Sequence, residues 1–314
     1  MLTSGGDAPG MNAAIRAIVR KGISVGLEVL GVQRGYAGLI GADFLQMGLS
    51  SVADVIQRGG TVLHTARSEE FRAPEGRARA VENLRRHGVE GLIIVGGDGS
   101  FRGAQALGAA GVAAVAIPGS IDNDIYGTEL SIGFDTAVNN VVEAINKIRD
   151  TASSHERTFV IEVMGRDTGF IALYAGLAGG AESILIPEVP FSLDEVCDRL
   201  VRGRDRGKRH SLILVAEGVG SGIAVGEEIR RRTGFETRVT VLGHLQRGGS
   251  PTATDRYIAS LMGARAVELL VEGRPGKMVG MAGGGVVERD LTEVIGRKKE
   301  FDPALYQLAL TLSV

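Results

Sequence analysis

Short apolar runs that do not alternate with polar residues set the strongest limit on how this chain can fold. Seven of them occur, at residues 27–32, 91–95, 113–117, 158–163, 183–187, 211–216 and 238–243. A strand with one covered face would alternate, so these runs predict strands that are buried on both faces. Helical patterns lie between them, at 77–88, at 136–152 with Thr136 as the N-cap, and at 192–207. Strands that alternate with helices predict a doubly wound, mainly parallel α/β fold.

Glycines and polar residues follow nearly every one of these strands. The exits read "GGDGS" after 91–95, "PGSIDND" after 113–117, "MGRDTG" after 158–163, "EGVGSG" after 211–216 and "HLQRGGS" near the end of the last run. Plain turns do not need aspartate, arginine, glutamate and histidine in the same topological place. A shared ligand cleft does, and we expect one at these strand ends.

Composition excludes several classes of protein. A chain of 314 residues with a net charge of −2 and no tryptophan does not resemble a base-stacking nucleic-acid binder. Its single cysteine, Cys197, cannot form an internal disulfide, and no apolar stretch approaches a membrane span or a signal peptide. We therefore expect a cytoplasmic protein, with Cys197 as a buried structural thiol on its helix rather than a nucleophile.

Two glycine turns, "TSGGDAPG" at 3–10 and "VGGDGS" at 95–100, are either tight strand-to-helix turns or phosphate cradles. Adjacent glycines let backbone N–H groups approach a phosphate, and a following helix start favours negative charge. Each turn carries an aspartate, and Asp98 is suited to hold Mg²⁺ beside phosphates. The chain has neither a P-loop nor a G-x-G-x-x-G fingerprint.

Residues 116–124, "AIPGSIDND", are a turn by composition, yet they place Asp122 and Asp124 at a strand end. Several arginines accompany such ends, and the guanidinium fork suits phosphate. These candidates are Arg67, Arg72, Arg157, Arg166, Arg238 and Arg247, with His244 nearby. The histidines show no zinc-ligand spacing. From the residues alone, the pattern favours phosphoryl transfer between two phosphorylated ligands.

The ordered motifs resemble bacterial ATP-dependent 6-phosphofructokinases from "LTSGGDAPGMNAAIR" to about residue 300. "GGDGS", "PGSIDND", "SSHER", "EVMGR", "AEG" and "ETRVTVLGHLQRGGSP", with "DR" at 255–256, occur in family order. The resemblance implies two doubly wound α/β sandwich lobes with the active site in the cleft between them. The larger, ATP-binding lobe would comprise 1–132 plus 245–295, and the smaller, fructose 6-phosphate-binding lobe 133–244 plus 296–314.

Site residues follow from the same resemblance. The ATP site would comprise Gly6, Arg67, Ser68, Gly97, Asp98, Gly99 and Ser100, with Asp98 serving Mg²⁺. The sugar-phosphate site would comprise Ser120, Asp122, Met164, Gly165, Arg166, Glu217, His244 and Arg247. Arg157 and Arg238 match residues that reach a neighbouring subunit's site, which implies a homotetramer. Asp122 would be the general base, with Ser120 and Arg166 as the other catalytic residues, whereas the role of Asp124 stays open.

Two glycines bear on the phosphoryl donor. Pyrophosphate-dependent members of the family resemble this chain except for Asp at position 99 and Lys at position 119. Gly99 and Gly119 therefore favour ATP over pyrophosphate. The "GGDG" loop also resembles that of NAD kinases and diacylglycerol kinases, but these would lack "PGSIDND" followed by "GHLQRGG". A non-catalytic sugar-phosphate sensor would be expected to have lost Asp98 or Asp122, and both are present.

Two departures from the family pattern concern the start of the chain and regulation. Family members carry several residues before "LTSGG", so the first strand is expected to be shortened and the true N-terminus is open. Residues matching an ADP or phosphoenolpyruvate effector site are Arg16, Arg20, Asp54, Arg149, Gly180, Glu182, Lys208 and His210. Leu49 stands where arginine is common and Arg206 where lysine is, so a weakened or altered effector response is expected.

Overall fold

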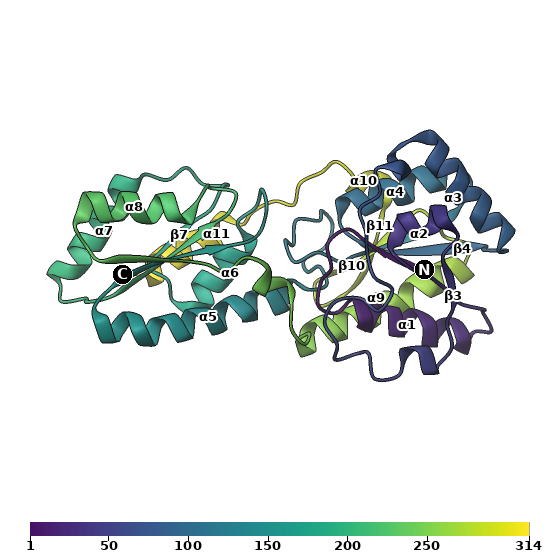
Figure 1. Ribbon diagram of the computed structural model, residues 1–314, viewed down its shortest axis with the longest axis horizontal. Helices are drawn as coiled ribbons and strands as arrows, with labels where there is room; N and C mark the ends of the chain where they lie inside the picture. Colours follow the sequence, from purple (N-terminus) through teal and green to yellow (C-terminus); the bar gives the residue numbers. More distant parts are fainter. Residues whose placement is uncertain (314) are drawn as a thin grey trace. The chain divides into compact units, whose positions relative to one another are not determined.

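The computed structural model describes residues 1–313, which form two compact units. The first unit comprises Met1–Thr136 and Arg247–Lys299, and the second comprises Ala137–Gln246 and Glu300–Val314, of which the last residue lies outside the described part. Each unit is built on its own β-sheet with helices on both faces (Figure 1). The prediction of mainly parallel, doubly wound α/β architecture is confirmed.

The first unit contains a seven-stranded sheet in the order β11-β10-β5-β4-β1-β2-β3. Its strands are β1 (Leu2–Ser4), β2 (Leu30–Val32), β3 (Phe44–Gln46), β4 (Gly91–Gly96), β5 (Ala113–Pro118), β10 (Lys277–Ala282) and β11 (Gly285–Asp290). The five inner strands are parallel, whereas β3 and β11 pair antiparallel at the two edges. These antiparallel partners at the edges leave the parallel core buried, as its non-alternating sequence predicts.

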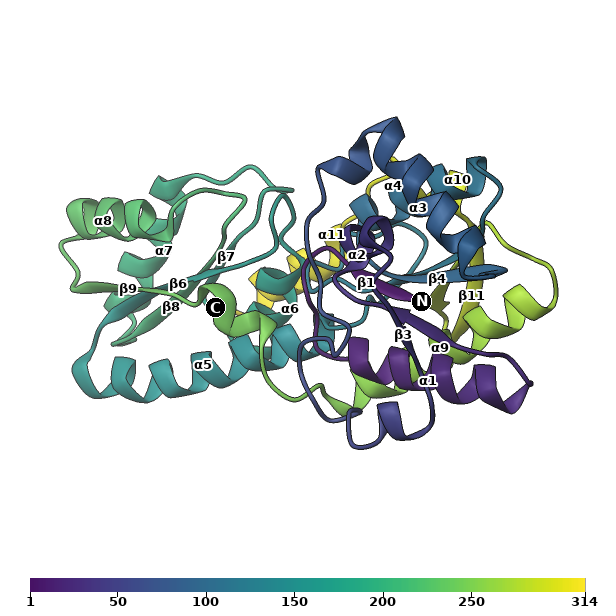
Figure 2. The same cartoon turned by 45° about the vertical axis from the view of Figure 1, so that its right-hand side comes forward.

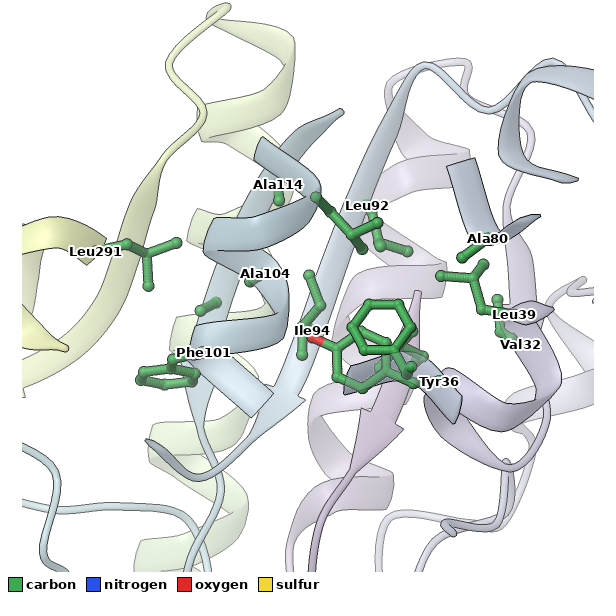
Figure 3. Packing of buried hydrophobic residues seen from close by; sticks show 14 of the residues in the cluster. Val32, Tyr36, Leu39, Ala80, Leu92, Ile94, Phe101, Ala104, Ala114 and Leu291 are labelled. Carbon is green, nitrogen blue, oxygen red and sulfur yellow. The ribbon is translucent and has the colours of Figure 1, made fainter. Parts of the chain in front are cut away.

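Helices cover both faces of this sheet. They are α1 (Met11–Ser24), α2 (Gly35–Gly41), α3 (Pro74–Arg86), α4 (Asp98–Ala109), α9 (Ala253–Val271) and α10 (Leu291–Val294), with short 3-10 turns at Ser50–Val52 and Glu70–Arg72. In both ribbon views α1 and α9 lie together on one face, and α2, α3 and α4 lie on the other (Figure 2). Figure 3 shows Tyr36, Ile94 and Phe101 among the side chains packed under the second group.

The second unit contains a parallel four-stranded sheet in the order β7-β8-β6-β9. Its elements are α5 (Phe134–His155), β6 (Thr158–Val163), α6 (Phe170–Gly179), β7 (Ser183–Leu185), α7 (Leu193–Asp205), β8 (Ser211–Ala216), α8 (Gly222–Thr233), β9 (Thr237–Val241), a 3-10 turn η3 (Gly243–Arg247) and α11 (Pro303–Leu312). The first turn of α5 and the last residue of η3 belong to the first unit. Cys197 is buried on α7 among apolar side chains, as predicted.

The prediction that Thr136 caps a helix is wrong, because α5 begins two residues earlier, at Phe134. Thr136 instead donates its hydroxyl to Asp255 Oδ2 at 2.5 Å. The Asp255 carboxylate is fully buried and also accepts the backbone N–H of Gly133 (2.7 Å) and of Thr136 (2.8 Å). One carboxylate on α9 thus fixes the start of α5, which begins ten residues after Asp124.

Within residues 1–313 no helix combines the length and the apolar character that a membrane crossing requires.

Stability is expected to depend on the protonation of Asp255. Burial raises its pKa from 3.8 to about 6, and the three donated hydrogen bonds only partly oppose this rise. The folded-state pKa exceeds the unfolded one, so the associated stability is complete below about pH 4 and is lost as the pH rises through about 6. Between pH 5 and pH 7 the loss is on the order of 1 kcal/mol.

Thermal unfolding of the wild type and of Asp255→Asn at both pH values checks this expectation. The thermal midpoint of the wild type minus that of Asp255→Asn should be larger at pH 5 than at pH 7, because the amide does not titrate. Asp290→Asn, which removes an exposed carboxylate paired with Lys277, is the control. A wild-type minus Asp255→Asn difference that stays constant with pH would contradict the assignment.

Candidate active site

Three strand exits lie side by side at the carboxyl edge of the first sheet. Strands β1, β4 and β5 are adjacent and parallel, so the loops that follow them emerge at one edge. The backbone N–H of Gly119, after β5, donates to Gly96 O at the end of β4 (3.0 Å). A side chain at Gly96 would place its Cβ only 2.4 Å from Ser4 O of β1. The three exits therefore pack so closely that a residue with a side chain does not fit at position 96.

The "GGDGS" loop is a strand-to-helix turn that opens α4. Gly97 is the N-cap, and its carbonyl accepts the N–H groups of Ser100 (2.9 Å) and Phe101 (3.1 Å). A Cβ on Gly97 or on Gly99 would meet no atom within 4 Å, so this turn faces open space. The helix start that it exposes favours a negatively charged ligand such as a phosphate.

Tyr36 stabilises this turn from the buried side. Its hydroxyl donates to Ser100 O at 2.6 Å, and its ring stacks on Phe71 at 4.0 Å between centroids. Gly103 on α4 makes room for the ring, since a Cβ there would lie 2.5 Å from the Tyr36 Cζ. Burial raises the pKa of Tyr36, so the hydroxyl stays protonated and remains a donor.

Asp98 lies in the first turn of α4, where a carboxylate interacts favourably with the helix dipole. Its Oδ2 accepts from Arg102 Nε at 2.9 Å, and about 43% of its side chain is exposed. Residues 1–313 contain no group of three histidine, cysteine or acidic side chains placed to hold a metal. A single exposed carboxylate suits Mg²⁺ that takes its remaining ligands from water and phosphates, because Mg²⁺ in phosphate sites is held that way.

The first glycine loop contacts two other candidate segments. Thr65 donates its hydroxyl to Gly5 O (2.8 Å), which places the segment with Arg67 and Ser68 beside this loop. Arg247 Nη1 donates to Asp7 O (3.2 Å), and a Cβ on Gly6 would lie 2.7 Å from the same nitrogen. Gly6 thus leaves room for a guanidinium that a larger residue would displace.

The loop after β5 carries Asp122 in a buried position, with 2% of the residue exposed. The Asp122 N–H donates to Ser120 Oγ (3.2 Å), and Ser120 Oγ donates to Asp124 Oδ1 (3.5 Å). Asn123 adopts a left-handed conformation (φ 53°), and its Oδ1 accepts the Ser131 N–H at 2.9 Å. Side-chain hydrogen bonds therefore give this turn a single shape and keep the Asp122 carboxylate at the strand end.

In the second unit, the exits of β6 and β8 are interlocked. Glu217 Oε1 accepts the N–H groups of Gly165 (3.1 Å) and Arg166 (2.6 Å). Arg166 is left-handed (φ 52°), and a Cβ on Gly218 would lie 2.4 Å from Arg166 O. Glu217 thus shapes the turn that carries Met164, Gly165 and Arg166, in addition to any contact with a ligand.

The 3-10 turn after β9 is tied to the same edge of the second sheet. Gln246 is fully buried, its Oε1 accepts the Met164 N–H (3.1 Å), and its Nε2 donates to Gly243 O (3.0 Å). His244 lies exposed on this turn. Sequence reasoning missed Gln246 and Tyr36, because a buried side chain that only orders a loop has no local signature.

Arg157 and Arg238 lie at the amino ends of the strands of this sheet, opposite the carboxyl ends that the loops above follow. Arg157 immediately precedes β6 and Arg238 is the second residue of β9, whereas Arg166 and His244 follow these strands. A six-residue strand spans roughly 20 Å, which separates the two sets. Both arginines form ion pairs with Glu236 Oε1, at 2.8 Å and 2.7 Å.

The predicted effector residues of the second unit lie toward the same amino ends of the strands. Gly180 and Glu182 precede β7, Lys208 and His210 precede β8, and Arg149 lies in the C-terminal half of α5. Arg149 Nη2 donates to Gly180 O (3.1 Å), and Lys208 pairs with Glu182 Oε1 (2.9 Å). His210 directly precedes β8, and Arg206 caps the end of α7. In the first unit, Arg16 and Arg20 lie on α1, Asp54 follows the turn Ser50–Val52, and Leu49 is 53% exposed.

Comparison with known proteins is consistent across sequence and structure. Residues 1–270 match the family model described as Phosphofructokinase. The ATP-dependent 6-phosphofructokinase of Halalkalibacterium halodurans is 59% identical over 314 residues, covering 100% of this chain and 98% of the relative. The phosphofructokinase structure from Saccharomyces cerevisiae matches 99% of this chain at 38% identity with a TM-score of 0.89, and the match spans 47% of that longer chain. A pyrophosphate-dependent phosphofructokinase from Marinobacter aquaeolei shares the fold, with a TM-score of 0.84 at 22% identity over 99% of this chain and 90% of its own.

The close packing of the strand exits predicts that Gly96→Ala destabilises the first unit. Its Cβ would approach backbone, Ser4 O, which cannot swing away as a flexible side chain can. We expect a loss of roughly 1–3 kcal/mol, measured by urea unfolding. Gly108→Ala on α4 is the matched control. Its Cβ meets nothing within 4 Å, so alanine should stabilise by roughly 0.5–1 kcal/mol. Equal stability of the two variants would refute the packing account.

Proposed function

Because this chain belongs to the phosphofructokinase family, we propose that it transfers the γ-phosphoryl group of ATP to the 1-hydroxyl of D-fructose 6-phosphate. The products are fructose 1,6-bisphosphate and ADP, and the reaction is the committed phosphorylation of glycolysis. One observation supports the chemistry: a buried carboxylate, Asp122, and the "GGDGS" glycine turn follow two adjacent parallel strands. Phosphoryl transfer needs a base for the attacking hydroxyl close to the cradled phosphates.

ATP is held by the glycine turns of the first unit. Gly6, Gly97, Gly99 and Ser100 supply backbone approach, with Arg67 and Ser68 alongside. The partly exposed Asp98 carboxylate, which pairs with Arg102 in this structure, would hold Mg²⁺. When bound, Mg²⁺ neutralises charge on the phosphates.

Asp122 acts as the general base and removes the proton of the sugar's 1-hydroxyl as that oxygen attacks the γ-phosphorus in line. Such a base contributes roughly 10²- to 10⁴-fold in rate. Arg67 and Arg166 offset negative charge on the transferring group. The hydrogen bonds that shape the 119–124 turn give the carboxylate its position before substrate arrives.

Fructose 6-phosphate is recognised by Ser120, Met164, Gly165, Arg166 and Glu217, and His244 and Arg247 bind its 6-phosphate. Glu217 already bonds two N–H groups of the Met164–Arg166 turn, so it orders that turn as well as contacting the sugar. A bidentate guanidinium and a histidine suit a phosphate dianion.

The enzyme is proposed to act as a homotetramer in the cytoplasm, with Arg157 and Arg238 serving a neighbouring subunit. These two arginines lie at the edge of their sheet away from Arg166, so they are badly placed to serve the site of their own chain. In the assembly each would exchange Glu236 for a sugar phosphate of the partner.

Donor choice is proposed to follow from Gly99 and Gly119. A side chain at 99 would project into the open space that a nucleotide needs. A Cβ at 119 would lie 3.0 Å from Met11 Cε and 3.1 Å from Val95 Cγ1, so the lysine of pyrophosphate users requires both neighbours to shift. Pyrophosphate is therefore the second candidate donor, behind ATP.

Asp122→Ser should lower kcat by roughly 10²- to 10⁴-fold while fructose 6-phosphate still binds, because only proton removal is lost. Coupled-assay kinetics, with sugar-phosphate binding by calorimetry, measure both. Asp290→Ser, which removes a surface carboxylate paired with Lys277, should leave kcat unchanged. A variant that turns over at near the wild-type rate would remove Asp122 from the role of base.

Effector binding by ADP or phosphoenolpyruvate is proposed to be weak, because Leu49 offers no charge to a phosphate. One charged hydrogen bond to phosphate is worth roughly 1.5–3 kcal/mol. Leu49→Arg should therefore lower the half-effective ADP concentration by about 10- to 100-fold in activity titrations. Titrations of the variant and the wild type that superimpose would reject this effector site.

A further inference from the structure

Three consecutive residues near the end of the first unit run along the loop that carries Asp122. Arg297 Nη1 donates to the Tyr126 hydroxyl (3.1 Å), and its guanidinium lies 5.1 Å from the centre of that ring. Lys298 forms an antiparallel backbone bridge with Ile125. Lys299 Nζ donates to Glu129 O at 2.6 Å. This segment, Arg297–Lys299, touches the loop at Tyr126, Ile125 and Glu129, and none of these belongs to the substrate contacts proposed above.

The Glu129 carbonyl joins Lys299 to the Asp122 turn. The same oxygen accepts the side-chain amide of Asn123, with Nδ2 at 3.1 Å. Asn123 stands between Asp122 and Asp124, and its left-handed backbone sets the direction in which both leave the turn. A carbonyl with two lone pairs can accept both donors at once.

The far side of this junction is fixed to the sheet. The Glu129 N–H donates to Met281 O of β10 (2.7 Å), and Glu129 Oε1 accepts the Gly283 N–H (3.0 Å). The carbonyl therefore has a rigid base, and the Lys299 ammonium adds a charged donor to it. Hydrogen bonds from a charged donor are stronger than neutral ones.

The ammonium is held there at an electrostatic cost. Burial lowers the pKa of Lys299 to about 8, and the nearby carboxylates of Glu129 and Asp124 oppose that fall. The neighbouring Lys298 is exposed, whereas Lys299 is partly buried. A half-buried ammonium attracts the carboxylates of the loop beside it more strongly than an ammonium in water does.

We propose that Lys299 is a positioning residue for the Asp122 base, acting through the shared Glu129 carbonyl and the Asn123 amide. This inference rests on the proposed function, and it adds a residue that touches neither substrate nor nucleotide. Loss of the ammonium removes one of the two donors to the Glu129 carbonyl and leaves the Asn123 amide as the other, so the turn is held less tightly and samples more conformations. Displacement of a base by a fraction of an ångström to 1 Å slows proton transfer, whereas substrate affinity depends on other residues.

Steady-state kinetics of Lys299→Met and Lys299→Arg test the proposal, with Lys298→Met as the matched control. Methionine keeps most of the length of the side chain and removes its charge and donor. For Lys299→Met we expect kcat to fall roughly 10- to 100-fold, with KM for ATP and for fructose 6-phosphate within about twofold of wild type. Lys299→Arg should recover most of kcat, because arginine also donates to a carbonyl. Lys298→Met should match the wild type, since its contact with Ile125 is made by backbone.

Thermal midpoints and the active-site concentration of each variant separate positioning from folding. A Lys299→Met enzyme with wild-type kcat would overturn the proposal. So would a loss of activity that tracks the loss of active sites and that Lys299→Arg does not relieve, because this is the mark of a purely structural role. A wild-type protein that fails to phosphorylate fructose 6-phosphate would instead refute the proposed function, and that result is read before any variant is made.

Discussion

The close approach of three parallel strand ends in the first unit is the constraint on which the rest of the structure depends. Gly96 lies against Ser4 O with no room for a Cβ, and Gly119 donates its N–H back to Gly96 O. This packing brings the glycine turn of β4 and the aspartate turn of β5 to one edge. The proposed phosphate cradle and the proposed general base are thereby made neighbours by backbone alone.

Side-chain hydrogen bonds then fix the shape of each loop, with donors and acceptors from elsewhere in the chain. Tyr36 holds the "GGDGS" turn, Asp255 fixes the helix start after the aspartate loop, and Glu217 and Gln246 shape the turn after β6. In the second sheet the carboxyl ends of the strands carry the proposed sugar contacts, whereas the amino ends carry the arginines proposed to serve a partner subunit or an effector.

Sequence patterns were sufficient for the parallel core and the candidate loops, because buried strands and glycine exits leave local signatures. The first strand was expected in shortened form, whereas β3, β10 and β11 were not predicted. β10 pairs with the distant β5, and β3 and β11 are edge strands with a partner on one side only. Thr136 was assigned to a helix cap on local preference, but the buried Asp255, more than a hundred positions away, decides its role. Lys299 shows the same limit: a lysine in a polar stretch has no sign of its contact with Glu129. The proposed roles of the site residues stay predictions that chemistry must test.

The central claim is that ATP and fructose 6-phosphate react together on this protein. Phosphorus NMR of the purified protein with Mg²⁺, fructose 6-phosphate and either ATP or pyrophosphate measures this directly, because donor, sugar phosphate and product give separate resonances. The account predicts stoichiometric conversion of ATP and fructose 6-phosphate to ADP and fructose 1,6-bisphosphate, with pyrophosphate left intact. Conversion driven by pyrophosphate alone, or loss of ATP without sugar bisphosphate, would contradict it.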